Sequence, residues 1–434
     1  MKNRFLFLLY YFPPVTGTAA KRNFRIAKAI SQKAESVLVY TASQVQEGHV
    51  STSDVTVQRI KAFDYRALLR RRTKDGALPE ESKSNVFAQS LIRLINTFPF
   101  NIIAGEGGLF YFFKLMSRAN KVIRQKDITH LYSSYRPFAD HYAAYWLKKK
   151  NPELIWIADF RDLVIDPHYR HILFPEAHHR FFKKLFAKAD VLTTVSDGLA
   201  AHLRAYHPKV ITLRNGIDAI APTVPIATAH FTIAYTGSMF LDKRNAEPLF
   251  LALQQLFQDA LLEAGDIRIV YAGKDSRYWK NMARKYRFES ILEDRGMVSG
   301  EEATRIQKEA CINLLLTISS EALRGVLTGK MIEYFESGSP VLGIIVGDND
   351  PELIEILAHL EAGATFSDQP HDLDAIKDFL NKEYLLWKQS GHNRKPLNTQ
   401  YLKHHYAQEA VMEPLYSILE LEQSDNSIEI GTPI

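Results

Sequence analysis

Short apolar runs that alternate with helical patterns constrain the fold of this chain more than any other feature of its sequence. In the first half, the runs are RFLFLLYYF, SVLVYTA, THLYSS, LIWIADF, DVLTTVS and VITLRN. Helical patterns, FRIAKAISQ and DGLAAHLRAYH, lie between some of them. Strands that are apolar on both faces and alternate with helices indicate a parallel sheet covered on both sides. The sequence therefore predicts an α/β fold.

A second series follows the turn dipeptide Asn215-Gly216 and a Pro- and Ala-rich stretch, DAIAPTVPIATAH. Its predicted strands are FTIAYTG, IRIVYAG, INLLLTI and PVLGIIVG, and its helical patterns are NAEPLFLALQQLF, EEATRIQKEA and KMIEYFES. A length of 434 residues suits two domains. We expect domains over residues 1–219 and 220–400, a C-terminal helix over 401–422 with a kink at Pro414, and a disordered tail over 423–434.

Composition narrows the class of protein. With 46% hydrophobic and 24% charged residues, the chain has the profile of a soluble globular protein. The net charge of +5 comes with basic clusters that suit solvated faces, anionic lipid or a nucleotide diphosphate. No nucleic-acid-binding motif accompanies them, so we expect no nucleic-acid partner. A single cysteine, Cys311, predicts a reducing compartment and a cytoplasmic location.

The N-terminal apolar stretch is interpreted as a core strand, because Pro13 and Pro14 follow it and no small-residue cleavage site appears. Residues 98–116 form the most membrane-like segment, but polar residues and glycines interrupt it. We expect no membrane-spanning helix there.

Candidate site residues in the first half follow predicted strands, where doubly wound folds bind ligands. Gly17 lies between the first strand and a helix, although the dinucleotide fingerprint GxGxxG is absent. An ordinary turn is an equally good interpretation there. Asp159, Arg161 and Asp162 follow another strand, where they could form a structural ion pair or orient a hydroxyl and a phosphate.

Glycine turns with cations follow the first two strands of the second half. The residues concerned are Gly237, Ser238, Lys243 and Arg244 in the first turn, and Gly273 and Lys274 in the second. Positive groups placed there suit a diphosphate, because they stabilise the charge that develops on a departing nucleotide. Solvated lysines are the alternative interpretation for any one of them.

The segment EALRGVLTGKMIEYFESGSPVL is the most specific feature of the chain. Gly325, Thr328 and Gly329 precede a predicted helix from Lys330 to Ser337, and Gly338 ends it. The free N–H groups and dipole of such a helix favour a phosphate, with Lys330 at its mouth. Glu333, near one turn farther on, could accept hydrogen bonds from ribose hydroxyls.

These segments, with ADFRDL, ADVLTTVSDGL, LRNGID and PPVTGTAAKR, resemble the retaining glycosyltransferases of family 4, which have the GT-B fold of two facing Rossmann-like domains with a central cleft. The resemblance runs from about residue 5 to 420. It implies a nucleotide-diphosphate sugar donor in the C-terminal domain and an acceptor in the N-terminal domain.

The resemblance also implies roles for single residues. Glu333 would bind the ribose, and the amides of Leu327, Thr328 and Gly329 would contact the diphosphate. Lys243 or Arg244 would neutralise that diphosphate, and Gly17 would lie near the reacting end of the donor. The final helix would return to the N-terminal domain.

The chain departs from the family pattern at two positions. Gly325 stands where the family usually has the first of two glutamates separated by seven residues, and Ser238 stands where many relatives have arginine. A subgroup that resembles transferases for bacterial surface polysaccharides carries a TGK-type segment in that place. Both changes leave phosphate and ribose binding in place but leave the donor sugar open.

The resemblance further implies transfer with retention by a front-face route that uses no protein nucleophile. Catalysis would then consist of positioning and of electrostatic stabilisation of the leaving diphosphate. The triplet Asp348-Asn349-Asp350 imitates a metal-binding motif but is expected to belong to a loop. We expect no metal and no cofactor.

Several interpretations remain open from the sequence. The acceptor would be a glycan or a lipid-linked molecule at the inner face of the cytoplasmic membrane. Residues between Phe63 and Arg124 could supply a peripheral membrane contact, or could be ordinary N-terminal helices. A nucleotide-sugar epimerase on the same fold would need an acid and a base, for which only Asp159 and Asp162 present themselves. A catalytically silent nucleotide-sugar-binding subunit is compatible with Gly325.

Overall fold

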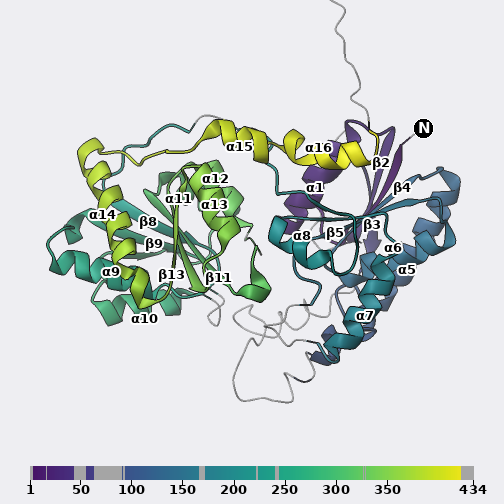
Figure 1. The fold of residues 1–434 in the computed structure, drawn as a ribbon, viewed down its shortest axis with the longest axis horizontal. Coiled ribbons are helices and arrows are strands. Elements are labelled where there is room, and N and C mark those ends of the chain that lie inside the picture. The colour runs from purple at the N-terminus through teal and green to yellow at the C-terminus, as the bar shows by residue number, and fades with distance from the viewer. Residues whose placement is uncertain are drawn as a thin grey trace, which may run out of the picture. The chain divides into compact units, whose positions relative to one another are not determined.

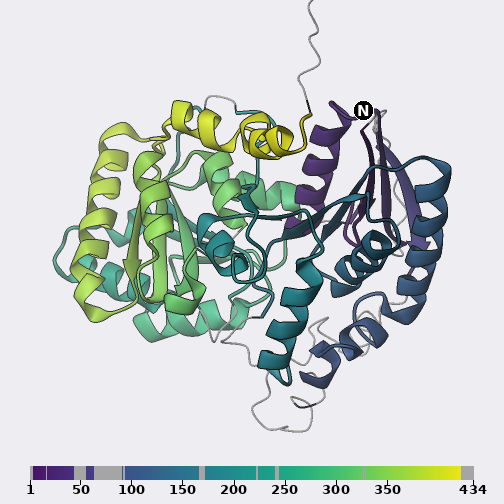
Figure 2. The same ribbon diagram turned by 45° about the vertical axis from the view of Figure 1, so that its right-hand side comes forward.

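A computed structural model describes residues 3–15, 17–43, 55–62, 90, 93–165, 172–220, 223–239, 244–325, 327 and 329–421. The chain divides into two compact units (Figures 1 and 2). Unit 1 comprises Met1–Arg214 and Val411–Ile434, and unit 2 comprises Asn215–Ala410. The tail predicted to be disordered, 423–434, lies outside the described residues.

Unit 1 contains a seven-stranded parallel sheet in the order β3-β2-β1-β4-β5-β6-β7. This is the doubly wound order, with an additional strand at one edge. The strands are β1 (Arg4–Leu8), β2 (Ser36–Ser43), β3 (Val55–Lys61), β4 (His130–Ser134), β5 (Ile155–Phe160), β6 (Val191–Thr194) and β7 (Val210–Thr212).

Helices cover both faces of this sheet. They are α1 (Thr18–Ser31), α4 (Phe100–Ile103), α5 (Gly108–Gln125), α6 (Phe138–Lys150), α7 (Pro175–Phe186), α8 (Asp197–Leu203) and the part of α16 (Gln408–Ile418) from Val411 onward. Along β1, Phe5 and Phe7 pack in a core with α1 and α16, whereas Leu6 and Leu8 pack in a core with α5 to α8. The alternation follows from the period of two residues in a strand.

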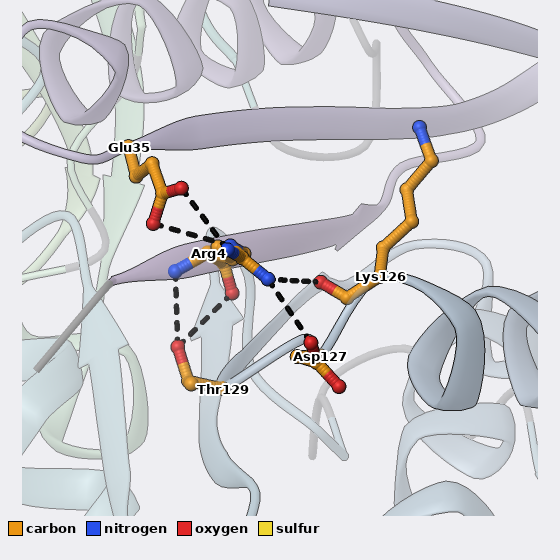
Figure 3. A network of polar contacts seen from close by, with 5 residues as sticks. All are labelled: Arg4, Glu35, Lys126, Asp127 and Thr129. Atoms are coloured by element: carbon orange, nitrogen blue, oxygen red, sulfur yellow. Dashed lines mark hydrogen bonds and ion pairs between the residues drawn. The ribbon is translucent and has the colours of Figure 1, made fainter.

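An ion-pair network joins the amino ends of β1 and its neighbours (Figure 3). The Arg4 side chain donates to both carboxylate oxygens of Glu35, to the Lys126 carbonyl and to Asp127. The Arg4 N–H donates to the Thr129 hydroxyl over 3.0 Å. These contacts lie at the edge of the sheet opposite the carboxyl ends, where doubly wound folds bind ligands, so they stabilise the fold.

Unit 2 contains a six-stranded parallel sheet in the order β10-β9-β8-β11-β12-β13, which is again the doubly wound order. The strands are β8 (Phe231–Thr236), β9 (Ile267–Ala272), β10 (Leu292–Asp294), β11 (Ile312–Ser319), β12 (Val341–Gly347) and β13 (Gly363–Ser367).

The helices of unit 2 also cover two faces. One hydrophobic core places α9 (Glu247–Gln258), α10 (Ser276–Tyr286) and α14 (Leu373–Ser390) on one face. On the other face lie α11 (Gly300–Glu309), α12 (Lys330–Ser337) and α13 (Pro351–His359). Short 3-10 turns occur at η1 (Ala264–Asp266), η2 (Glu321–Leu323) and η3 (Pro370–Asp372). Two Rossmann-like sheets covered by helices confirm the predicted α/β fold class.

The predicted C-terminal helix over 401–422 is instead two helices, α15 (Thr399–Tyr406) and α16. The break is at Ala407, which forms a parallel bridge with Ile217. The Ile217 N–H donates to the Tyr406 carbonyl over 2.7 Å, and the Gln408 N–H donates to the Ile217 carbonyl over 3.0 Å. This pairing draws the backbone out of the helix at a residue with no helix-breaking character, whereas Pro414 lies inside α16.

Candidate functional site

The strand order of unit 2 reverses between β8 and β11, which are neighbours in the sheet but not in the sequence. In open α/β sheets, the crevice beyond the carboxyl ends at such a reversal is where ligands bind. The chain leaves β8 through the turn at Gly237 and leaves β11 through the segment that ends at Lys330. Both predicted phosphate-binding segments therefore flank the switch point.

Two glycines let the turns after β8 and β9 approach closely. Gly237 has φ 124°, and its N–H donates to the Ala272 carbonyl over 2.6 Å. A Cβ added at Gly273 would lie 2.3 Å from the Gly237 oxygen, and one added at Gly237 would lie 2.4 Å from the Lys330 Nζ. Any larger side chain at either position would have to displace one of these groups.

Lys330, the first residue of α12, directs its ammonium into this turn. The Lys330 Nζ lies 4.1 Å from the centroid of the Tyr235 ring. Burial, together with the charge of Arg244, lowers the pKa of Lys330 to about 7, although the carboxylates of Glu333 and Asp275 act in the opposite direction. The Lys330 ammonium therefore loses its proton more readily than an ordinary lysine, and an anion placed beside it would favour the protonated, charged form.

Arg244 reaches the same turn from the chain that precedes α9. Its Nη1 donates to the Tyr235 hydroxyl over 3.0 Å and to the Ser238 carbonyl over 2.5 Å. The Tyr235 hydroxyl also donates to the Ser238 carbonyl over 2.7 Å. A guanidinium is thus present at this turn although position 238 is serine. Lys243 lies outside the described residues, and Lys274 is exposed.

Two residues of this site were not found by sequence reasoning. Tyr235 contacts both Lys330 and Arg244, and Asp275 accepts from the Met239 N–H over 2.8 Å. The aromatic residues that precede both glycine turns, in AYTG and VYAG, were the available signal for Tyr235.

Gly325 belongs to a backbone turn that Asp350 holds in place. Gly325 has φ 70°, in the left-handed region that glycine favours, and its N–H donates to Asp350 over 2.8 Å. Asp350 also caps α13 by accepting from the N–H groups of Glu352 and Leu353. Asp350, in the triplet that imitates a metal motif, therefore lies in a loop, and it also caps α13.

The segment KMIEYFES forms α12, Lys330–Ser337, with the predicted bounds. Gly329 is its N-cap, no side chain caps the helix there, and Gly338 ends it with φ 72°. Glu333 lies three residues after Lys330, so both point from the same side of the helix. Tyr334, four residues after Lys330, is buried, and its hydroxyl donates to the Leu314 carbonyl over 3.0 Å, which anchors the helix to β11. Thr328 lies outside the described residues, and Leu327 is half-buried.

Asp159 lies in unit 1, where it forms a buried ion pair with Arg22 of α1. Arg22 donates from Nη2 over 2.7 Å and from Nε over 3.2 Å, and both side chains are buried. The hydroxyls of Ser134 and Thr193 also donate to this carboxylate. The Asp159 oxygens thus connect β5 to α1, β4 and β6. This geometry fits a structural ion pair, the first of the two interpretations of Asp159 from sequence.

Arg161 and Asp162 lie closer to the surface than Asp159. The Arg161 Nε donates to the Tyr135 carbonyl over 3.0 Å, and Asp162 is exposed. The Tyr135 phenol, with the carboxylates of Asp162 and Glu106, raises the pKa of Arg136. Arg161 therefore holds the backbone of Tyr135, which follows β4, and the Asp162 carboxylate favours the charged form of Arg136.

A pocket of about 60 Å³ opens at this end of β4. Its polar lining comprises Asn96, Asn101, Glu106, Tyr135, Arg136 and His178. The strand order of unit 1 reverses between β1 and β4, so the pocket lies beside the switch point of its own sheet. Gly17, with φ 129°, is the N-cap of α1 beyond β1.

Solved structures with the same fold cover nearly the whole chain. A glycosyltransferase from Rickettsia africae is 12% identical over 98% of this chain and 99% of its own, with a TM-score of 0.59. The lipopolysaccharide outer core galactosyltransferase WaaB is 11% identical over 96% and 99%, with a TM-score of 0.58. A trehalose-6-phosphate protein from E. coli, bound with UDP-2-fluoro glucose, is 12% identical over 97% and 99%, with a TM-score of 0.60.

These similarities establish the GT-B glycosyltransferase fold for this chain. No protein-family model matches the sequence, and no curated protein matches it either. The fold is therefore established, whereas the family and the reaction have to be inferred from the residues of the site.

Proposed function

We propose that this protein is a retaining glycosyltransferase that takes a sugar from a nucleotide-diphosphate donor held by unit 2. The observation that carries the proposal is the convergence of Lys330, Arg244 and the Gly237 turn at the switch point of that sheet. Two cations at a glycine turn, beside a helix N-terminus whose N-cap is the glycine Gly329, suit a diphosphate.

Each donor residue has a distinct function in this proposal. Lys330 and Arg244 neutralise the diphosphate, and the charge that develops on the leaving group strengthens both contacts in the transition state. The amides of Leu327, Thr328 and Gly329 contact the phosphates, and Glu333 binds the ribose. Arg244 supplies, at the turn that contains Ser238, the guanidinium that many relatives supply from an arginine at position 238. Gly273 and Lys274 border the same turn.

The acceptor is a glycan or a lipid-linked sugar that binds to unit 1. The pocket beside Arg136 and Glu106 supports this assignment, because carboxylate, amide and guanidinium groups recognise hydroxyls. Transfer with retention is inferred from the resemblance to family 4. A role in surface-polysaccharide synthesis is inferred from the TGK-type segment. Asp162 and Arg161 act through the segment that lines the pocket, and Gly17 lies beyond β1 of the same sheet.

A panel of UDP-, GDP- and dTDP-linked hexoses, tested by thermal shift and by slow donor hydrolysis, examines the proposal. A true donor should raise the melting temperature by several degrees at saturation. Lys330→Ala and Glu333→Ala should lose that shift, whereas Lys382→Ala, an exposed lysine of α14, should keep it. If no sugar nucleotide stabilises the wild type, the proposal fails. If NMR showed a product with inverted anomeric configuration, only the retaining mechanism would be rejected, and the donor site would still stand.

A further inference from the structure

Exposed aromatic and aliphatic side chains gather on one part of unit 1. Among the described residues, those of α4 and the start of α5 include Phe100, Ile103, Leu109, Phe110 and Phe113, with 40%, 44%, 39%, 50% and 62% exposure. Large apolar residues exposed singly are ordinary, but five within one short stretch mark an interaction surface. We call these five residues the apolar cluster.

The outer side of α5 continues the apolar cluster with basic residues. Its charged residues are Lys114, Arg118, Lys121 and Arg124, and the helix contains no Asp or Glu. Phe110, Lys114, Lys121 and Arg124 recur at helical spacing, so they share the side that faces away from the buried Tyr111, Leu115 and Val122. The Lys114 Nζ lies 4.2 Å from the centroid of the Phe110 ring, where the aromatic and basic parts meet.

Acidic residues occur only at the ends of this helix. Glu106, before α5, lines the pocket at the end of β4, and Asp127, after it, is paired with Arg4 over 3.3 Å. Within α5 itself, the outer side therefore carries only positive charge. A second copy of the chain placed on this surface with twofold symmetry would bring like charges together.

We infer that α4 and the outer side of α5 bind the surface of an anionic lipid bilayer. Rings that insert at the level of the headgroups, followed by a row of cations on the same side, are typical of interfacial helices. Within the described part of the chain, no helix is long and apolar enough to span a membrane. The inferred contact is therefore peripheral. Its residues, 100–124, fall within the stretch from Phe63 to Arg124 that the sequence suggested for such a contact, of which residues 63–89 lie outside the described part of the chain.

This inference does not depend on the donor site of unit 2. It nevertheless places a bilayer beside the unit 1 pocket, because Asn101, Gly105 and Glu106 of the α4–α5 segment line that pocket. A lipid-linked acceptor held in the bilayer would then reach the pocket without leaving the surface.

Flotation of the full chain with vesicles tests the inference. We expect binding to phosphatidylcholine vesicles that contain phosphatidylglycerol, little binding to phosphatidylcholine alone, and weakening as salt increases. Phe110→Ser with Phe113→Ser should weaken binding by about tenfold or more, because two rings no longer insert. Lys114→Glu with Lys121→Glu should remove the preference for anionic vesicles.

Matched controls lie in unit 2. Leu385→Ser, at an exposed leucine, and Lys382→Glu should leave flotation unchanged, and circular dichroism should show that every variant folds. The inference is wrong if the wild type does not float, if it floats equally well with neutral vesicles, or if the α5 variants bind as the controls do. Concentration-dependent dimers in light scattering that the Phe110 and Phe113 substitutions abolish would assign the surface to a second copy instead.

Discussion

The Lys330 ammonium lies 4.1 Å from the Tyr235 ring centroid, so the first residue of α12 reaches the carboxyl end of β8. This relationship joins the two segments that flank the switch point of unit 2. The contact with the ring face favours the charged ammonium, so the lowered pKa of Lys330 comes from burial and from the charge of Arg244.

Donor binding should weaken as pH rises above about 7, the pKa of Lys330 in the free protein. A bound diphosphate favours the charged lysine, so binding takes up a proton in this range. Each pH unit above the free pKa should cost up to about tenfold in affinity until the pKa of the complex is reached. Calorimetric titration with a sugar nucleotide, whose diphosphate keeps its charge throughout, measures this slope. A flat profile in the wild type would show that Lys330 does not contact the phosphates.

Lys330→Met should stabilise the free protein while removing donor binding. The folded pKa of about 7 lies below the ordinary 10.5, so the unfolded state holds the extra proton between these values. Stability of the wild type should therefore rise with pH across that window. Replacing the lysine by methionine should remove this slope and add about 1 kcal/mol or more near pH 7. Urea unfolding measures both effects, and Lys382→Met should show neither.

Asp159→Asn should lower the free energy of unfolding, and not only the rate of turnover. Breaking a buried pair leaves the Arg22 charge unpaired inside unit 1, which costs about 3–5 kcal/mol. Arg4→Gln, in the partly exposed network of Figure 3, should lower stability far less, because solvent screens these ion pairs. Denaturant midpoints compare the two variants. A fully stable but inactive Asp159→Asn protein would instead support the catalytic interpretation of this residue.

Asp140→Asn should remove a pH dependence from unit 1. Burial raises the pKa of Asp140 from 3.8 to about 7, although the Tyr10 N–H and the Tyr111 hydroxyl both donate to it. A raised carboxyl pKa contributes stability that is present below about pH 4 and lost as pH rises to about 7. Unfolding curves over this range should show that decline in the wild type and not in the variant. An identical decline in both would assign it to other groups.

Gly325→Ala should destabilise the turn that Asp350 holds. The φ of 70° favours glycine, so a Cβ should cost about 1 kcal/mol or more. For the same reason, Gly325→Glu should not increase turnover, even though the family usually has glutamate there. A more active Gly325→Glu protein would show that the missing carboxylate limits catalysis. Gly265→Ala, with no atom within 4 Å of an added Cβ, is the control.

The central strands were predictable from sequence, whereas three of the four edge strands were not; the fourth, β7, lies within the predicted run VITLRN. IRIVYAG coincides with β9, and INLLLTI with most of β11, because both strands are buried on both faces and read as continuous apolar runs. The strands β3, β10 and β13 escaped prediction. All three lie at sheet edges, where partial exposure weakens the apolar signal.

The candidate site shows a similar division. Gly237 and α12 were predictable because a glycine turn and a short apolar helix that ends at a glycine are local patterns. The partner of Asp159 was not predictable, because Arg22 lies 137 residues away in the sequence. The break at Ala407 likewise depends on pairing with Ile217, a contact that no local pattern encodes.

Calorimetric titration of sugar nucleotides into the wild type and Arg244→Gln tests the central claim most directly. Arg268→Gln is the matched control, because Arg268 lies near the amino end of β9, at the opposite edge of the same sheet. We predict that at least one sugar nucleotide binds, and that losing the Arg244 guanidinium weakens binding by about tenfold or more while the control binds normally. Binding of no sugar nucleotide, or equal binding by both variants, would contradict a donor site at the Gly237 turn.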